Sequence, residues 1–320
     1  MPPDAAPPAD AGPRVRPRVL IIVGSGRSGS TLIERALGEV PGVAPLGETV
    51  HMWERGVRDS ELCGCGQPFG TCPFWQSVGQ VAFGGWHQID AQVAIDDRQA
   101  VVRTRFIPEL LGPSVRSGWR LRRDRLTRRL QATYEAAQTV SGATLLVDSS
   151  KMPAYAALLT RVVDLRCLYV VRDPRGVAWS WSKEVTRPEV VDASSQMHRY
   201  TPRQSAWWWS TFDAAVRSMA RIGIPTHTVR YEDFVSDPRE SIRDVLAFAG
   251  HPTDDARLAH LESAQVTLGP AHLVAGNPMR FRTGPMPLRV DDEWRRALPT
   301  MDRLVVTLLT APSRRRYHYR

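Results

Sequence analysis

The stretch VLIIVGSGRSGSTLIERAL, residues 19–37, constrains the fold of this chain more than any other. A short aliphatic run leads through a glycine-rich loop into an amphipathic helix. Gly24 and Gly29 have the spacing of a phosphate-binding loop, in which backbone N–H groups and a helix N-terminus bind an anion. A nucleotide kinase carries a lysine after the second glycine, but this chain has Ser30. The sequence therefore predicts an anion site that works without that lysine.

Further apolar segments alternate with helical patterns along the chain. The expected strands are 18–23, 43–46, 144–147, 165–171 and 226–230. The expected helices are 30–40, 117–140, 152–163, 174–184, 202–222 and 238–250. Alternation of short, almost continuously apolar strands with helices indicates a parallel sheet covered on both faces. The predicted fold class is thus α/β, with a parallel central sheet of the P-loop nucleotide-binding type.

The connection between the second and third expected strands is abnormally long. It spans about 100 residues, whereas a crossover in a compact domain needs far fewer. We expect residues 49–140 to form a helical and loop insertion that builds a cap or a substrate pocket. Residues 1–16 are rich in proline and alanine and predict a disordered leader, followed by a single domain over 17–320.

The charge of the chain is strongly basic, with a net value of +9. Only Lys151 and Lys183 are lysines among its 42 basic residues, so the rest are arginines. Codon usage in a GC-rich genome explains most of this bias, and anionic ligands are the alternative explanation. The Arg-rich helix over 116–130 is expected to expose a solvated face. The sequence has neither a signal peptide nor a membrane-length apolar run, so we expect a cytoplasmic protein without a transmembrane segment.

Three of the four cysteines fall in one loop, ELCGCGQPFGTCPFW, as Cys63, Cys65 and Cys72. Their spacing fits no common zinc pattern. Packed reduced thiols, one local disulfide and a metal site completed by a residue such as His87 all stay open. Cys167 lies in an apolar run and is expected in the core.

A second cluster follows the fourth expected strand, in the run LYVVRDPRGVAWSWSKE. Arg172 comes at the strand end, Asp173 has the character of a helix cap, and Pro174 suits a first helical position. Ser180 comes eight residues after Arg172, so both side chains can face one oxyanion near the start of the helix. Taken alone, this run would indicate only a capped helix with an exposed arginine.

The two clusters together resemble the sulfotransferases that use 3′-phosphoadenosine 5′-phosphosulfate (PAPS), and bacterial members most. In that family the first loop holds the 5′-phosphosulfate. Its counterpart here consists of Ser25, Gly26, Arg27, Ser28, Gly29, Ser30 and Thr31. The family also uses an arginine at a strand end and a serine eight residues later to hold the 3′-phosphate, which Arg172 and Ser180 match.

Two later segments extend the resemblance. The run VRYEDFVSDPRESI, residues 229–242, looks like the segment after the family's last strand and implies that Tyr231 lies near the adenine. Residues 272–298 resemble the basic closing loop, which implies that Arg280, Arg282 and Gly284 return to the nucleotide. The resemblance implies PAPS as the donor, its desulfated form PAP as the product, and no metal requirement.

The resemblance also implies which residues carry the transfer. Glu48 stands in the Gly-Glu context in which related enzymes place a catalytic base, and His51 is a rival. Arg27 is the expected clamp on the sulfuryl and bridging oxygens. Lys151 follows the third expected strand, where the family often carries a lysine that neutralises the leaving group.

Two other function classes are considered. A kinase would use ATP and Mg²⁺, with Asp148 at a strand end as a metal ligand. A basic protein that binds nucleic acid without catalysis would leave Glu48 and Lys151 without a role. We expect a small-molecule, carbohydrate or lipid acceptor bound by the 49–140 insertion, and no nucleic-acid partner. The oligomeric state is not predicted. At least one indole of the triplet Trp207–Trp209 is expected in the core, because three adjacent side chains cannot share one helix face.

Overall fold

The central element is a five-stranded parallel sheet with the strand order β2-β3-β1-β4-β5. A computed structural model describes residues 16–114, 116–184, 199–251 and 253–319, so nearly all of the expected leader, 1–16, lies outside the described residues. The strands are β1 (Arg18–Val23), β2 (Val43–Pro45), β3 (Leu145–Lys151), β4 (Asp164–Val171) and β5 (Thr226–Arg230). All five expected strands are present, and β3 runs further than expected, to Lys151.

Strand β1 explains why both faces of the sheet are covered. Its side chains alternate between two separate hydrophobic clusters. Val19, Ile21 and Val23 belong to one cluster, whereas Leu20 and Ile22 belong to the other. These five residues are at most 1% exposed. A central parallel strand buried on both sides is the pattern that its continuous aliphatic run predicts, and the predicted fold class is confirmed.

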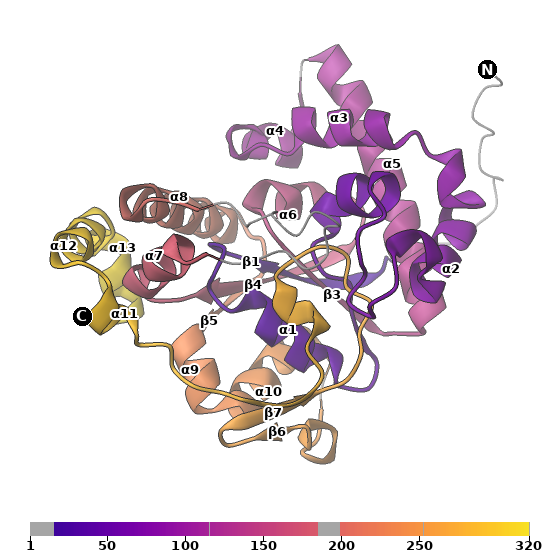
Figure 1. The fold of residues 1–320 in the computed structure, drawn as a ribbon. Coiled ribbons are helices and arrows are strands. Elements are labelled where there is room, and N and C mark those ends of the chain that lie inside the picture. The colour runs from indigo at the N-terminus through magenta and orange to yellow at the C-terminus, as the bar shows by residue number, and fades with distance from the viewer. Residues whose placement is uncertain (1–15, 115, 185–198, 252, 320) are drawn as a thin grey trace.

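Helices cover the two faces as Figure 1 shows. One face carries α1 (Ser30–Gly38), α9 (Tyr231–Ser236) and α10 (Pro238–Phe248). The opposite face carries α6 (Pro153–Leu159), α8 (Pro202–Arg221) and the insertion, and α7 (Pro174–Ser182) packs against α8. Asp173 caps α7, because its carboxylate accepts the Arg175 N–H at 2.9 Å, as the sequence predicts. In the Trp triplet, Trp209 is 1% exposed and forms part of the core, as predicted.

The insertion between β2 and β3 is built from helices. A 3₁₀ turn (Thr49–His51) and a π-helix (Met52–Arg58) lead into α2 (Pro73–Phe83), α3 (Ala91–Val101), α4 (Ile107–Leu111) and α5 (Ser117–Ser141). The basic face of α5 is not wholly solvated. The buried carboxylate of Asp97 on α3 pairs with Arg122, Arg125 and Arg129 at 3.6, 2.6 and 3.3 Å. Part of the Arg-rich face therefore neutralises a charge inside the insertion.

The C-terminal part adds a small antiparallel sheet that the sequence analysis did not predict. It contains β6 (Leu261–Glu262), β7 (Gln265–Leu268) and β8 (Gly284–Pro287), and is followed by α11 (Trp294–Ala297), α12 (Thr300–Leu309) and α13 (Ala311–Arg314). Between β7 and β8 the orange segment of Figure 1 leaves the small sheet and passes beside α1. Among the described residues, no helix combines the length with the apolarity that a membrane span requires.

The buried carboxyl group of Glu34 joins α1 to two strand ends. Its Oε1 atom accepts the Gly47 N–H at 2.7 Å, and its Oε2 atom accepts the Ser149 hydroxyl. The side chain is 0% exposed. Burial raises the pKa of Glu34 to about 8, although both hydrogen bonds oppose that rise. Glu34 is therefore protonated in the folded protein at neutral pH.

We predict that Glu34 makes stability fall as pH rises. The unfolded chain loses this proton near pH 4.5 and the folded chain near pH 8, so the unfolded state binds fewer protons between these values. Glu34→Gln keeps an acceptor for Gly47 and removes the titration. The free energy of unfolding of the variant minus that of wild type should increase across this window by an amount on the order of 4 kcal/mol. Urea denaturation at several pH values measures it, and a pH-independent difference would show that Glu34 is ionised in the fold.

Candidate functional site

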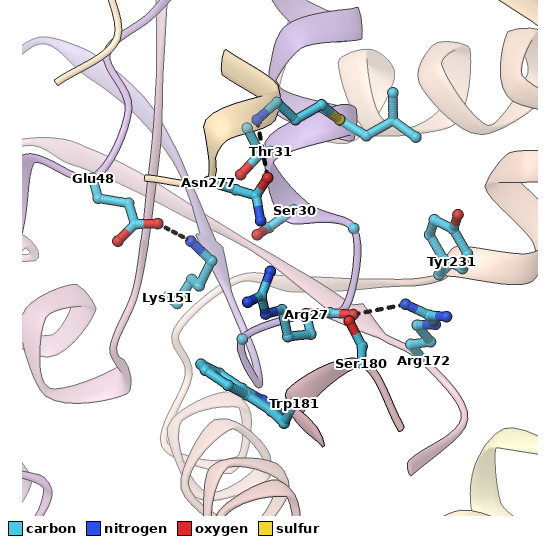
Figure 2. Close-up of a pocket in the computed structure, with 14 residues that line it drawn as sticks. Arg27, Ser30, Thr31, Glu48, Lys151, Arg172, Ser180, Trp181, Tyr231 and Asn277 are labelled. Atoms are coloured by element: carbon cyan, nitrogen blue, oxygen red, sulfur yellow. Dashed lines mark hydrogen bonds and ion pairs between the residues drawn. The ribbon is translucent and has the colours of Figure 1, made fainter. Parts of the chain in front are cut away.

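A cavity of about 290 Å³ lies at the carboxyl ends of the parallel strands. It is lined by Gly26, Arg27, Gly29, Ser30, Thr31, Leu32, Glu48, Lys151, Arg172, Ser180, Trp181, Tyr231, Asn277 and Met279. Each of the five strands contributes a residue that ends it or lies in the turn after it. Figure 2 shows these residues around the cavity: Arg27, Glu48, Lys151, Arg172 and Tyr231. The cavity is at the lower end of the size range of small-molecule sites.

The loop from β1 to α1 forms one wall. Gly29 caps α1 in the left-handed region at φ 89°, and a Cβ there would lie 2.4 Å from the Tyr231 ring. A Cβ at Gly26 would lie 2.6 Å from the Trp181 ring. Both glycines therefore let the backbone approach aromatic rings that larger residues would displace. The first N–H groups of α1 and the Ser30 and Thr31 side chains face the same cavity, which is the arrangement of an anion site.

Two charged residues of the cavity hold unusual backbone conformations. Arg27 has φ 70° and Lys151 has φ 64°, the left-handed region that side chains other than glycine rarely adopt. The Arg27 guanidinium also lies over the Trp181 ring, 5.0 Å from its centroid. Such backbone outliers cost free energy and cluster at functional sites. Here both aim a basic side chain into one cavity.

Arg172 stands at the opposite end of the cavity from Lys151 (Figure 2). Its Nη1 donates to the Arg27 carbonyl at 3.0 Å, and its Nη2 donates to the Asp291 carboxylate at 2.9 Å. The guanidinium also lies 4.9 Å from the centroid of the Tyr231 ring. Ser180 lies beside Arg172 in the lining, so the spacing of eight residues does bring the two side chains to one place.

Glu48 and Lys151 form an ion pair across the cavity, and Lys151 Nζ also donates to the Ser149 carbonyl at 3.2 Å. The His51 Nε2 atom lies 3.8 Å from the Glu48 carboxylate. Burial acts to raise the pKa of Glu48, but Lys151 and the other nearby cationic groups outweigh it and hold the pKa below its ordinary value. Glu48 is therefore an ionised carboxylate at neutral pH, in contact with a cation.

Not every residue singled out from the sequence lines the cavity. Ser25 and Ser28 belong to the loop but are buried behind it, at 8% and 1% exposed. The Ser28 hydroxyl has no hydrogen-bond partner among the described residues. Arg282 is exposed, and Gly284 begins β8, where it pairs with Leu268 in the small sheet.

Arg280 departs most from its expected position. Its side chain is 0% exposed, and its guanidinium donates to the carbonyls of Gly276 at 2.7 Å and Leu62 at 3.2 Å. Arg280 lies in the 3₁₀ turn Pro278–Phe281, which precedes β8, and its side chain is buried in the interior. In this conformation Arg280 joins two chain segments and does not reach the cavity.

The metal ligand required by the kinase hypothesis is also buried. Asp148 is 0% exposed, and its carboxylate accepts the hydroxyls of Thr49 and Tyr134 and the Ser150 N–H. Burial raises the pKa of Asp148. These bonds occupy the carboxylate inside the core, so it does not face the loop as a Mg²⁺ ligand would.

Four lining residues were not expected from the sequence: Leu32, Trp181, Asn277 and Met279. Trp181 follows Ser180 directly, so the helix that places the serine also places the indole. Asn277 and Met279 come from the segment between β7 and β8, and the Asn277 side chain accepts the Met279 N–H at 3.0 Å. Both residues lie in the run AGNPM within 272–298, the segment that resembles the closing loop. That resemblance implied only Arg280, Arg282 and Gly284 as nucleotide contacts.

Comparison with known families decides the class of the protein. A profile described as the sulfotransferase family matches residues 87–255, more than half of the chain. The chain belongs to the sulfotransferase family. The matched segment includes Lys151, Arg172, Ser180 and Tyr231, whereas Glu48 precedes it. Transfer of a sulfuryl group is accordingly the general activity assigned to this sulfotransferase.

Solved structures of sulfotransferases are similar to the chain at low sequence identity. A sulfotransferase domain from the olefin synthase of Synechococcus PCC 7002 has 19% identity and a TM-score of 0.47, covering 94% of this chain and 96% of its own. A sulfotransferase domain from the curacin biosynthetic pathway has 17% identity and a TM-score of 0.49, covering 93% and 99%. Sulfotransferase STF9 from Mycobacterium avium has 18% identity and a TM-score of 0.47, covering 95% and 77%. No curated protein sequence matches the chain.

Proposed function

We propose that this sulfotransferase moves a sulfuryl group from PAPS to a hydroxyl or amine of an acceptor, with Glu48 as the general base. One observation carries the proposal. The glycine-rich loop, the Glu48–Lys151 ion pair and Arg172 with Ser180 line the same cavity, although they come from distant parts of the chain. An anion site, a carboxylate base and two separate cationic groups are the parts that such a transfer needs.

The residues present fit the donor. Backbone N–H groups at the start of α1, together with Ser30 and Thr31, would hold the 5′-phosphosulfate. Arg172 and Ser180 would hold the 3′-phosphate. The buried Ser28 hydroxyl, which has no partner among the described residues, offers a further donor behind the loop. Tyr231 lies at the Arg172 end of the cavity and would contact the adenine.

Three residues carry the chemistry in this proposal. When bound, the donor supplies a sulfuryl group joined to phosphate through a bridging oxygen. Glu48 accepts the proton that the acceptor oxygen or nitrogen loses as it forms its bond to sulfur. Lys151 and Arg27 neutralise the charge left on the phosphate oxygen when its bond to sulfur breaks. A compact ammonium group suits a single oxygen, which explains a lysine where the chain otherwise uses arginine.

The Glu48–Lys151 contact links base and leaving group. Lys151 keeps Glu48 ionised, which is the protonation state that a base requires. A lysine that turns toward the leaving oxygen also releases the carboxylate for the acceptor. The insertion, 49–140, begins directly after Glu48, and in our proposal it binds a small-molecule, carbohydrate or lipid acceptor. Its described residues do not line the cavity itself, so the acceptor would approach from the Glu48 side.

The first prediction from this proposal concerns the donor. PAP should raise the melting temperature without Mg²⁺, whereas 5′-AMP and ATP with Mg²⁺ should raise it far less, because only PAP carries the 3′-phosphate. Arg172→Ala should weaken PAP binding by about 1.5–3 kcal/mol, the scale of a charged hydrogen bond. Arg221→Ala, which removes an exposed arginine at the end of α8, is the matched control. Equal stabilisation by AMP and PAP would remove Arg172 and Ser180 from the nucleotide site.

The second prediction concerns the base. Glu48→Gln keeps the side-chain shape and removes proton acceptance, so turnover with a verified acceptor should fall by roughly 10²–10⁴. PAP affinity, measured by calorimetry, should stay nearly the same. The exposed Glu262→Gln variant controls for the loss of one carboxylate. Near-normal turnover of a folded Glu48→Gln protein would move the base to His51 or into the insertion.

The third prediction concerns the pH profile. Because Lys151 lowers the pKa of Glu48, its replacement by methionine should raise that pKa. The acid limb of kcat/KM should therefore move to higher pH, since Glu48 must lose its proton to act as a base. Lys183→Met removes the only other lysine, which pairs with Glu293, and should leave the limb in place. An unmoved limb in the Lys151→Met variant would show that another group sets it.

A further inference from the structure

Three cysteines and a histidine converge on one point outside the cavity. We refer to Cys63, Cys65, Cys72 and His272 as the Cys₃His cluster; their ligand atoms lie within 4.8 Å of one another. Cys72 Sγ lies 3.6 Å from Cys63 Sγ, 3.7 Å from Cys65 Sγ and 3.2 Å from His272 Nδ1. All three cysteines are free thiols.

The spacing of these atoms matches a tetrahedral zinc site. Zinc–sulfur bonds of about 2.3 Å at tetrahedral angles place two thiolates about 3.8 Å apart, and a thiolate and an imidazole nitrogen about 3.5 Å apart. The three separations from the Cys72 sulfur are close to these values, and all four ligand atoms lie within 4.8 Å of one another. Three sulfurs and one nitrogen complete the coordination shell, which is typical of a structural site and leaves no position for a reacting water.

A tight turn between Leu62 and Pro68 positions the sulfurs of Cys63 and Cys65. Leu62 and Pro68 form an antiparallel bridge, and inside it the Cys63 N–H donates to the Gln67 carbonyl at 2.8 Å. Gly66 closes this turn in the left-handed region, at φ 85°. This turn places the sulfurs of Cys63 and Cys65 at 3.6 and 3.7 Å from the sulfur of Cys72, which directly precedes α2.

The histidine is held from the other side. The ring of His272 stacks on Phe74 with centroids 5.3 Å apart, and its backbone carbonyl accepts the Trp75 indole N–H at 3.1 Å. Both aromatic residues belong to α2, which begins directly after Cys72. The first turn of α2, which follows directly on the cysteine loop, therefore holds the His272 imidazole and backbone. His87, the fourth ligand considered from the sequence, is exposed and contacts Gln88 instead.

We propose that the Cys₃His cluster binds one Zn²⁺ ion and joins the insertion to the segment between β7 and β8. A disulfide would use only two of the three sulfurs. The third sulfur and the His272 imidazole would then lie beside it without a role. Zinc uses all four groups, and it agrees with the separations of their ligand atoms. The proposal is independent of the donor nucleotide, because it concerns a site that the transfer does not use.

The site would fix one wall of the cavity. Next to His272, the Leu273 carbonyl accepts the Gly64 N–H at 2.9 Å. The next residue is Val274, whose N–H donates to the Leu46 carbonyl. The Val274 carbonyl accepts the Glu48 N–H at 2.8 Å. A zinc ion at His272 would therefore hold the backbone partner of Glu48 two residues away, and would secure the segment that carries Asn277 and Met279.

Metal content tests the proposal directly. The full chain, expressed with added zinc and purified under reducing conditions, should contain about one zinc ion per chain by plasma mass spectrometry. Cys72→Ser and His272→Asn should each lower that content to below about a tenth. His87→Asn and Cys167→Ala are the matched controls and should keep the zinc. Loss of zinc in His87→Asn but not in His272→Asn would overturn the assignment, as would iron in place of zinc.

Measurements on the wild-type chain keep the test valid if a variant fails to fold. Cobalt substitution should give the intense thiolate charge-transfer absorption of a Cys₃His tetrahedral site. Removing the metal with a chelator should speed hydrogen exchange at Gly64, Val274 and Glu48 while leaving the core of β1 unchanged. A wild-type protein that takes up no zinc, or in which mass spectrometry finds two of the three cysteines joined as a disulfide, would disprove the site.

Discussion

The parallel direction of the strands is the constraint on which the whole site depends. Because β1 to β5 run the same way, their carboxyl ends meet at one edge of the sheet, and the chain must turn there after every strand. Those turns are where the polar residues stand. The loop after β1, Glu48 after β2, Lys151 ending β3, Arg172 after β4 and Tyr231 after β5 become neighbours through this geometry alone. The buried hydrophobic faces on either side hold the edge in register.

A second element completes what the sheet begins. The segment between β7 and β8 crosses to the end of β2 and pairs with the backbone on both sides of Gly47. A Cβ at Gly47 would lie 2.4 Å from the Val274 carbonyl, so only glycine allows this approach. From the other side, the protonated carboxyl group of Glu34 accepts the Gly47 N–H. Glu48 thus follows a residue that is held from two directions.

Local sequence signals predicted most of the fold and much of the site. The alternation of short strand candidates with helical patterns identified all five strands of the parallel sheet. The spacing of eight residues indicated that Arg172 and Ser180 lie together. Each of these signals depends on one element and its neighbours in the sequence. Contacts between distant segments were not predictable in this way. His272 reaches Cys72 across 200 residues of sequence, so the cluster could not be completed from its cysteine spacing. Arg280 was expected to bind the nucleotide, but its guanidinium donates to the carbonyls of Gly276 and Leu62 in the interior. No sequence pattern indicates such backbone partners.

The ion pair between Arg172 and Asp291 has a consequence for selectivity. The carboxylate already neutralises the guanidinium at 2.9 Å, and it is one-third exposed, so it can leave. An anion that binds Arg172, as we propose, would displace the Asp291 carboxylate from the guanidinium. The net binding free energy is then the difference between the interactions of the two anions with Arg172. This difference is small for a monoanion that resembles a carboxylate and larger for a doubly charged phosphate ester. In the proposed function, Asp291 would therefore act as an internal competitor of the incoming anion for Arg172.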